Sequence, residues 1–521
     1  MAAWALPVLA IVLLGLSQLN TFQTGSYYDD AWYIALGTAL ANGQGYVRPW
    51  TPFLNPETLI PPGFPLLLAL IRMLYQDNFI PMQLLSLVAS VGTVILCVNY
   101  YQRRLDEPWS RLLPLFLAVH VAFVRFSTLV MQEALYTFLS MSVIVLVARQ
   151  MGRAKTTMPI YFAIGLLATT AYFVRAWGIA LVAALVLWYT FRRNWRGLFC
   201  VIAPFSLGYV FWSARNNALG GAGASYGLSS ATVIPFLQEL AHDLPSKAVA
   251  QWVQNLPDFL IPLLFGPKVL EVLGKIGLAP LSFIAGGIVL AILITGYLAQ
   301  ARSKASVAEY YVPIYLVILT LGPQDSRYWV PLTPLLILYL TVGVKIIASW
   351  IANRLRIPRL APAFIGFGLF ALISLHLARD VQAVINPVRN RIPDVAVGPS
   401  WLATNVPIDA VVMAPVPRVT YIYSQRTTVP YPDGGDGQRY KLSPELYSLT
   451  ETTSLQRFYE SLDLFNVDYL LIEPDLVSGT PFSWQDYFRT EIIPALEQEP
   501  ERFQLVYMDE SELVRVYQVY D

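Results

Sequence analysis

The stretch WALPVLAIVLLGLSQLNTF, residues 4–22, is an almost unbroken apolar run of the length that a membrane-spanning helix needs. It lacks the basic segment and the small-residue cleavage site of a secretory signal, so we expect it to be retained as an anchor. Similar runs recur over the first three quarters of the chain. This repetition excludes a soluble enzyme with a single anchor.

The composition assigns the whole chain to the membrane class. Of its 521 residues, 56% are hydrophobic and 13% are charged, about half of the charged share of a soluble domain. We therefore expect a mainly α, polytopic membrane protein with about eleven transmembrane helices. They are predicted at residues 3–22, 81–101, 112–128, 131–148, 159–174, 177–191, 197–214, 278–299, 308–322, 330–348 and 361–378.

Lys and Arg residues gather at every second connection between the predicted helices. The clusters are Arg103, Arg104 and Arg111; Arg149, Arg153 and Lys155; Arg192, Arg193 and Arg196; Arg302 and Lys304; and Arg354, Arg356 and Arg359. Because basic residues accumulate in cytoplasmic loops, these connections are expected in the cytoplasm, and no nucleic-acid partner is indicated. The alternate connections, which include the long loops 23–80 and 215–277, then face outward. An odd number of spans places the C-terminal tail outside as well.

The last quarter of the chain differs from the rest. Residues 394–521 hold 20 of the 34 acidic residues and 8 of the 35 basic ones, so the tail is acidic and the membrane part is basic. Short β-branched or aromatic runs, such as AVVMA at 410–414, DYLLIE at 468–473 and FQLVYM at 503–508, alternate with helical stretches at 452–465 and 482–498. We expect a membrane domain over residues 1–393 and a small extracytoplasmic α/β domain over residues 394–521.

Carboxylates are scarce in the membrane part, where an ionisable group is costly enough to indicate function. The strongest cluster is SYYDDAWYIALGTALANGQGY at 26–46, where Asp29 and Asp30 begin a helix expected to lie in the membrane interface. The dipole at a helix N-terminus favours an ionised carboxylate, which can act as a general base toward an acceptor hydroxyl. From the residues alone, a pair of capping aspartates is the more common explanation.

Four further motifs lie at predicted outer ends of spans. Glu57 precedes a Pro-Pro-Gly-Phe-Pro turn in NPETLIPPGFPLLLAL at 55–70, and Glu133 opens the fourth span in VMQEALYTFL at 130–139. Arg215 lies in SARNN at 213–217, and Arg327 and Tyr328 lie in QDSRYWVPLTP at 324–334.

Together these motifs resemble the GT-C glycosyltransferases, specifically the bacterial branch similar to protein O-mannosyltransferases, aminoarabinose transferases and RgtA/B/C/D-like transferases. The family's acidic pair with a following Tyr is matched by Asp29, Asp30 and Tyr33, and its Pro-Pro-Gly turn by Pro61, Pro62 and Gly63. The acidic residue that opens its fourth span is matched by Glu133. Its Arg-Tyr-x-x-Pro-x-x-Pro motif is matched by Arg327, Tyr328, Pro331 and Pro334. The segment VPIDAVVMAPVPRVTYIYSQRTTVPYP resembles the family's outer domain, so the resemblance covers nearly the whole chain. The aminoarabinose branch has Glu-Lys before its proline where this chain has Ile60-Pro61, which argues against lipid A as the acceptor.

The resemblance implies an inverting glycosyltransferase of the plasma (inner) membrane, which moves a sugar from a polyprenyl-phosphate donor to a lipid, glycan or protein acceptor on the extracytoplasmic face. Asp29 is the implied general base with Asp30 beside it, and Arg327 stabilises the leaving phosphate. Further donor-phosphate or substrate-binding candidates are Tyr328, Arg215, Glu133, Glu57 and Tyr33. No cofactor is required, and a divalent metal held by carboxylates is left open.

Structural roles are open alternatives for several of these residues. Arg327 can pair with Asp325, Arg215 can snorkel to the interface, Glu133 can cap its helix, and the tyrosines can be interfacial aromatics. For the whole protein, the alternatives are a transporter or lipid flippase and a receptor or adhesion module on a passive anchor. Transporters usually show internal repeats and broken helices, which the sequence lacks, and a passive anchor does not need so many spans.

Overall fold

The protein divides into two compact units. The computed structural model describes residues 4–22, 24–76, 78–151, 157–219, 260–262, 264, 270, 275, 279–321, 326–357, 360–386, 395–432, 454–473 and 487–520. One unit, here called the helical unit, comprises Met1–Leu19, Thr58–Phe64 and Met82–Asn386. The other, the mixed unit, comprises Asn20–Glu57, Pro65–Pro81 and Pro387–Asp521.

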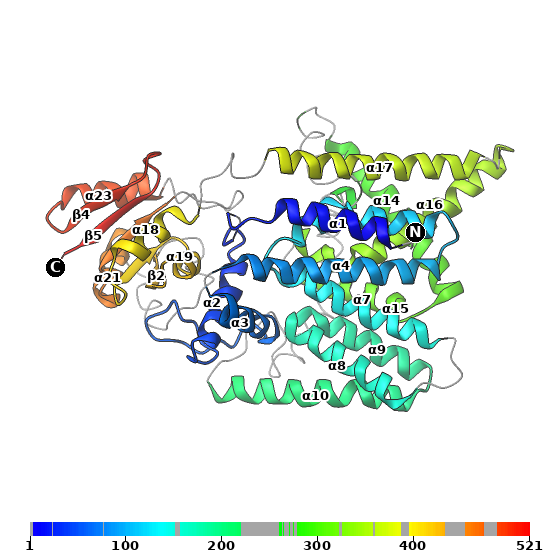
Figure 1. Ribbon diagram of the computed structural model, residues 1–521, viewed down its shortest axis with the longest axis horizontal. Coiled ribbons are helices and arrows are strands. Elements are labelled where there is room, and N and C mark those ends of the chain that lie inside the picture. The colour runs from blue at the N-terminus through cyan, green and yellow to red at the C-terminus, as the bar shows by residue number, and fades with distance from the viewer. Residues whose placement is uncertain are drawn as a thin grey trace. The chain divides into compact units, whose positions relative to one another are not determined.

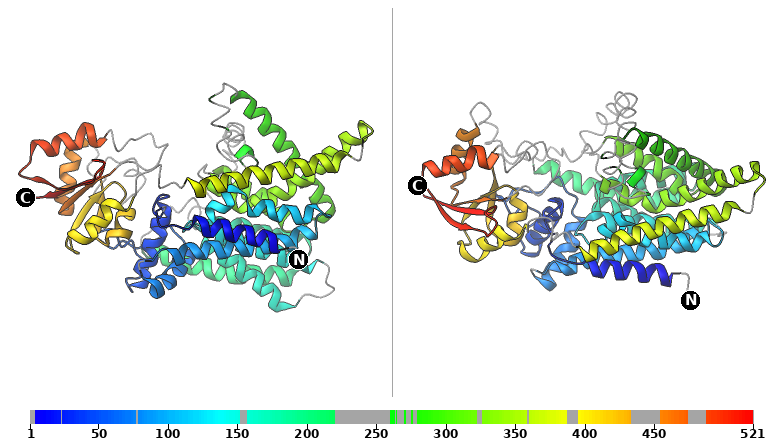
Figure 2. Two further views of the ribbon diagram at one scale, coloured as in Figure 1. Left: turned by 45° about the horizontal axis from the view of Figure 1, so that its top comes forward. Right: turned by 90° about the horizontal axis from the view of Figure 1, so that it is seen from above.

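The helical unit consists of long helices, several of which run nearly parallel to one another (Figure 1). Its helices are α1 (Ala5–Gln18), α4 (Ile80–Gln102), α5 (Trp109–Ala118), α6 (Val121–Phe126), α7 (Gln132–Gln150), α8 (Met158–Val174), α9 (Ile179–Phe191), α10 (Trp195–Ala218), α14 (Ala279–Lys304), α15 (Ala308–Leu321), α16 (Thr333–Arg354) and α17 (Leu360–Ile385). Two 3-10 helices, η1 (Ala176–Gly178) and η3 (Ser326–Leu332), precede α9 and α16. The views in Figure 2 show α1 beside α17. This contact brings together the first and last helices of the unit.

Six helices among the described residues are long and apolar enough to cross a membrane. They are Ile80–Gln102, Gln132–Gln150, Trp195–Ala218, Leu281–Lys304, Ser326–Arg354 and Pro362–Ile385. Four of the remaining predicted spans, at 3–22, 159–174, 177–191 and 308–322, coincide with shorter apolar helices, so the expected number of about eleven is not confirmed. The chain is nevertheless a membrane protein, as its composition predicted.

The single span predicted over residues 112–128 is wrong, because two helices occupy it. Helix α5 ends at Ala118 and α6 starts at Val121. His120 between them is extended, with φ −70° and ψ 117°, and the Val121 amide donates to His376 Nδ1 at 3.0 Å. A side chain of α17 thus takes the amide at the start of α6, where the helix offers no acceptor of its own.

Close backbone contact joins α14 to α16. A Cβ atom at Gly296 would lie 1.7 Å from the Tyr339 carbonyl oxygen, and one at Gly343 would lie 2.0 Å from that of Ile292. Only glycine fits at these two positions. Small residues of this kind let apolar membrane helices approach closely and gain van der Waals contact.

Glu309, in the first turn of α15, is part of a capping box. Its Oε2 accepts from the Ser306 amide at 2.6 Å, and its Oε1 accepts from Arg104 at 3.0 Å. Arg104 also donates to Gln300 and Ser306. The carboxylate and the guanidinium therefore enter the interior as a hydrogen-bonded pair, which offsets much of their desolvation cost.

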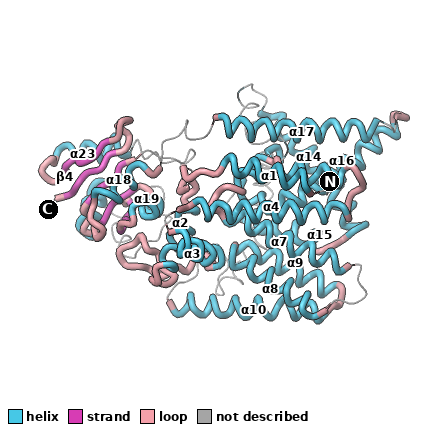
Figure 3. The backbone as a smooth tube through the Cα atoms, in the orientation of Figure 1, coloured by secondary structure: helices cyan, strands magenta, loops and turns pink. Residues whose placement is uncertain are grey.

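The mixed unit contains a five-stranded sheet, which is the only sheet in the described residues (Figure 3). Its strands are β1 (Val411–Ala414), β2 (Thr427–Pro430), β3 (Tyr469–Ile472), β4 (Phe503–Met508) and β5 (Arg515–Val519), in the order β2-β1-β3-β5-β4. Strands β2, β1 and β3 pair in parallel, whereas β5 pairs antiparallel with β3 and β4. The predicted strands at 410–414, 468–473 and 503–508 are confirmed.

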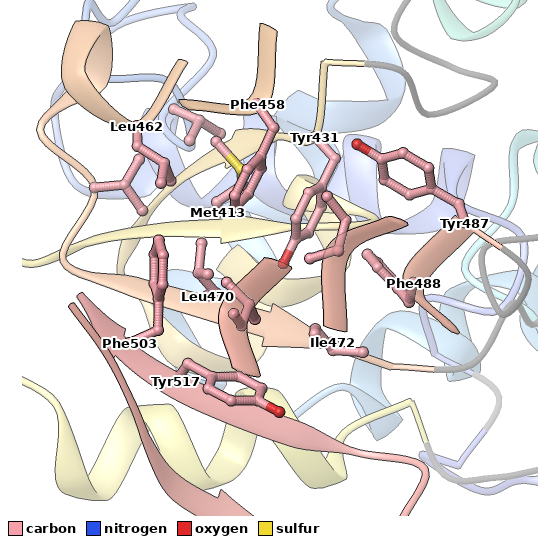
Figure 4. Packing of buried hydrophobic residues seen from close by; sticks show 14 of the residues in the cluster. Met413, Tyr431, Phe458, Leu462, Leu470, Ile472, Tyr487, Phe488, Phe503 and Tyr517 are labelled. Atoms are coloured by element: carbon pink, nitrogen blue, oxygen red, sulfur yellow. The ribbon is translucent and has the colours of Figure 1, made fainter. Parts of the chain in front are cut away.

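Helices cover both faces of this sheet. The mixed unit contains α2 (Asp29–Ala41), most of α3 (Gly63–Tyr75), α18 (Val397–Asn405), α19 (Pro417–Ser424), α21 (Ser454–Phe465), the π-helical η5 (Phe488–Ile492) and α23 (Ile493–Gln498). Met413 and Leu470 face a core completed by α21, η5 and α23 (Figure 4). Val412 and Leu471 point to the opposite face, toward α18. This alternation is the period-two pattern of strands.

Candidate functional site

Asp29 and Asp30 are the first two residues of α2. Tyr28 before them has φ 58°, and this sharp turn brings the chain back over the helix start. Asp30 is 1% exposed, and its carboxylate accepts from the amides of Gly25 at 2.7 Å and Ala31 at 2.9 Å. Asp29 is half-buried. The two neighbouring carboxylates therefore have different surroundings.

The environment of Asp30 changes its acidity. Burial raises the pKa of the Asp30 carboxyl from 3.8 to about 7; the negative charge of Asp29 adds to this rise, while the amide donors Gly25 and Ala31 oppose it. A group with this pKa exchanges its proton near neutral pH. The Asp30 carboxylate is hydrogen-bonded into the turn before α2, and Asp29 is the more accessible carboxylate of the pair.

Glu57 lies in the same unit and is held by three donors. It accepts from the Trp32 indole at 2.9 Å and from Arg48 at 3.0 and 3.4 Å, and its side chain is fully buried. The Arg48 and Arg418 guanidinium groups lie over the Trp32 ring, 5.7 and 4.5 Å from its centroid. Tyr33, the next residue, is 6% exposed. Glu57 is thus a buried carboxylate in an ion pair with Arg48, and its role in substrate binding stays a prediction.

The helical unit contains a second cluster, built on the break between α8 and α9. Arg175 at this break is extended, with φ −149° and ψ 124°, so its side chain leaves the helix direction. It forms an ion pair of 2.6 Å with Glu133, and both side chains are at most 5% exposed. The Glu133 Oε2 and Arg175 Nε atoms make no hydrogen bond within the described part of the chain. A ligand with donor and acceptor groups can satisfy both atoms.

Tyr328 joins this pair through its ring. Its centroid lies 4.8 Å from the Arg175 guanidinium and 4.9 Å from the Trp177 ring, which stacks on it. The Tyr328 carbonyl accepts from the Tyr315 hydroxyl at 2.9 Å. Arg327 lies 5.1 Å from the same ring and donates to the Tyr328 hydroxyl at 3.3 Å. Two guanidinium groups thus border one buried aromatic ring.

The structure brings together only some of the predicted site residues. Glu133, Arg327 and Tyr328 belong to the cluster in the helical unit, whereas Asp29, Asp30, Tyr33 and Glu57 belong to the mixed unit. Arg215, near the end of α10, lies over Trp212 at 5.0 Å and donates to Asn216 at 2.9 Å. Asp325, the alternative partner of Arg327, lies outside the described residues.

Sequence reasoning left Arg175 unassigned, although it is central to the second cluster. The signal was present in YFVRAWGIA at 172–180, a single charge between two apolar runs. Arg418 was missed as well, because nothing in the tail sequence links it to Trp32. In the described residues, no group of three His, Cys, Asp or Glu side chains is arranged to hold a metal ion.

The fold was compared with those of known proteins. ArnT from Cupriavidus metallidurans bound to undecaprenyl phosphate matches with a TM-score of 0.54, over 98% of this chain and 96% of that chain, at 12% identity. The archaeal oligosaccharyltransferase AglB from Archaeoglobus fulgidus, in complex with an inhibitory peptide and a dolichol-phosphate, matches with a TM-score of 0.54 over 90% of this chain and 69% of that chain, at 12% identity. The chain has the GT-C fold.

The GT-C likeness is one of structure. No protein-family model and no curated protein sequence matches this chain. At this level of identity the likeness shows the fold, and the GT-C resemblance inferred from the sequence motifs is confirmed at that level. One fold hosts many activities, so the function depends on the side chains of the site.

Proposed function

We propose that the protein is a membrane glycosyltransferase that moves a sugar from a polyprenyl-phosphate donor to an acceptor hydroxyl on the extracytoplasmic face. The observation that carries this proposal is the cluster at Tyr328, where Arg175 and Arg327 border one ring and the buried Glu133–Arg175 pair keeps two polar atoms that no described residue satisfies. A buried guanidinium with a spare donor, such as that of Arg175, suits a phosphate on a lipid carrier. The undecaprenyl phosphate and dolichol-phosphate named with ArnT and AglB are carriers of this kind.

The proposed chemistry is a single displacement. The acceptor hydroxyl gives its proton to Asp29 while its oxygen forms a bond to the anomeric carbon of the sugar. The bond between that carbon and the carrier phosphate breaks, and the electron pair leaves with the phosphate. Attack from the opposite side inverts the anomeric configuration.

Arginine suits the other half of this reaction. Its guanidinium is always charged and offers a planar fork to two phosphate oxygens. Arg327 is half-buried and can reach a lipid phosphate, and it stabilises the charge that develops on the leaving group. The Glu133–Arg175 pair keeps a second guanidinium beside Tyr328.

Incubation of the purified protein in detergent with a panel of polyprenyl-phosphate sugars tests the proposal. We expect release of free polyprenyl phosphate with at least one donor, and faster release when an acceptor with a free hydroxyl is added. Absence of turnover with every donor, together with translocation of lipid in reconstituted vesicles, would favour a flippase and overturn the proposal.

A further inference from the structure

Helix α19, in the tail, is buried on nearly all sides. It begins with Pro417, whose fixed φ suits a helix start, and ends at Gln425 in a left-handed conformation with φ 57°. Six of its eight residues are buried. Within the mixed unit it packs against α2, and Figure 1 shows the two helices next to each other although about 400 residues separate them in the sequence.

On one side, α19 holds the turn that precedes the aspartate pair. The Tyr423 hydroxyl donates to the Thr24 carbonyl at 2.8 Å, and its ring packs edge-on against Phe79 at 5.6 Å. Gly25 has φ +96°, and a Cβ atom there would lie 3.0 Å from a methyl group of Val419. Gly25 is also the residue whose amide binds the Asp30 carboxylate.

On the other side, α19 contacts Trp32, which lies about one helical turn after the aspartate pair. The Arg418 guanidinium lies 4.5 Å from the Trp32 ring centroid, and Arg418 is 3% exposed. Trp32 is three residues after Asp29, so the two side chains share one face of α2. A cation over an indole in a desolvated site is attracted by the ring more strongly than one at an exposed site, so this contact helps to fix Trp32.

Strand β2, which follows α19, adds further contacts to this region. The Thr428 amide donates to the Trp50 carbonyl at 2.7 Å, and its hydroxyl donates to the Pro417 carbonyl at 2.9 Å. Trp50 in turn meets the Trp32 ring edge-on at 6.1 Å. The contacts of α19 and β2 therefore surround the start of α2.

We infer that α19 is the element that positions Asp29, with Arg418 and Tyr423 as its positioning residues. The inference rests on the proposed role of Asp29 as the general base. A base works only within hydrogen-bonding reach of its proton, and a displacement of about 1 Å can cost roughly 100-fold in rate. The tail thus takes part in catalysis without touching the substrate.

Tyr423→Phe tests the inference with one lost hydroxyl group, because the ring contact with Phe79 is kept. Arg418→Met removes the cation over Trp32, whereas Arg418→Lys keeps a cation there. We expect Tyr423→Phe and Arg418→Met to lower kcat roughly 10- to 100-fold with unchanged donor affinity, and Arg418→Lys to recover part of the loss. Unchanged kcat in both Tyr423→Phe and Arg418→Met, or equal losses for Lys and Met at 418, would overturn the inference.

Arg426→Lys is the matched control. Arg426 is buried like Arg418, but its guanidinium donates to the carbonyls of Ala403, Val406 and Ser424, all within the tail. This variant perturbs the tail near α18 and at Ser424, the last residue of α19, but it keeps the contacts of Arg418 with Trp32 and of Tyr423 with Thr24. It is expected to keep its kcat when its thermal stability is as low as that of the test variants. A matching loss of kcat in this control would assign the effect to tail stability and overturn the inference.

Hydrogen exchange separates failure of this inference from failure of the proposed function. In Tyr423→Phe and Arg418→Met, amides of residues 24–34 should exchange faster than in the wild type, whereas in Arg426→Lys the faster exchange should be confined to the tail, at residues 397–410 and at the end of α19. This measurement needs no donor. Unchanged exchange over residues 24–34 in both test variants would overturn the inference even if the protein is an active transferase. Faster exchange there with an inactive wild type would contradict only the proposed function.

Discussion

Two adjacent aspartates have different surroundings because the chain turns sharply before them. At helical spacing their side chains diverge by about 100° around the axis. The sequence predicted the pair and the helix that it starts. It could not predict that Asp30 binds the Gly25 amide, because this contact depends on the positive φ of Tyr28, which no periodic pattern reveals. The preference for Asp29 over Asp30 as the base stays a prediction.

Asp29→Asn should abolish most transfer while the protein still folds and binds donor. Asparagine keeps the size of the side chain but cannot take up the acceptor's proton, and loss of a positioned base typically costs about 10² to 10⁴ in rate. Asp30→Asn should act mainly on stability, because it weakens the acceptor for Gly25 and Ala31. Donor turnover and donor binding measured on both variants decide this. Wild-type turnover in Asp29→Asn would contradict the assignment, and a larger loss of rate at Asp30 would exchange the two roles.

Glu473, which follows β3, predicts a pH dependence of stability. Burial raises the pKa of the Glu473 carboxyl from 4.5 to about 8. Between these two values the folded chain keeps a proton that the unfolded chain has lost, so the stability of the tail falls as the pH rises through this window. Glu473→Gln removes the titration. Thermal unfolding at pH 5 and pH 8 should show a smaller difference in this variant than in the wild type, and an equal difference would contradict the expectation.

The break between α8 and α9 shows what helices contribute to the site. The sequence predicted spans at 159–174 and 177–191, and the structure breaks there as expected. The sequence could not show that the break turns Arg175 toward Glu133 and Tyr328, because these contacts lie between separate helices. In the tail, β1, β3 and β4 were predicted from their apolar runs. Strand β2, TTVP, has too few apolar residues to be recognised, and it is ordered by its pairing with β1.

Removing one partner of the Glu133–Arg175 pair should destabilise the helical unit. Arg175→Met leaves a buried carboxylate without its cation, which typically costs about 3–5 kcal/mol. Adding Glu133→Gln removes the stranded charge and should restore much of the thermal stability. Donor turnover should stay low in the double variant if the pair also serves the phosphate. Recovery of both stability and turnover would restrict the pair to a structural role.

At the scale of the whole molecule, residues 20–57 and the tail form one compact unit. This grouping was not foreseen, because contacts between residues separated by hundreds of positions leave no local pattern in a sequence. It supports the proposed topology, since a compact unit that contains a sheet does not straddle a membrane.

Cysteine labelling tests the topology directly. Phe53 in the loop is 60% exposed and Ile408 in the tail is 66% exposed, while the native Cys97 and Cys200 are buried. We expect Phe53→Cys and Ile408→Cys to react with a membrane-impermeant reagent added from outside the cell. Labelling of either position only after the cytoplasm is opened would place that segment inside and exclude an extracytoplasmic site.

The pairing of Trp50 with Thr428 sets an order of events during synthesis. Roughly 380 residues must be translated between the two partners, which takes about 20–75 s at the usual rate of 5–20 residues per second. During that time α2 has already been synthesised, whereas α19 and β2, which contact it and Trp50, have not. A segment that is made among the first is thus among the last to gain its native contacts, and under the proposed topology these contacts form only after the tail has been translocated.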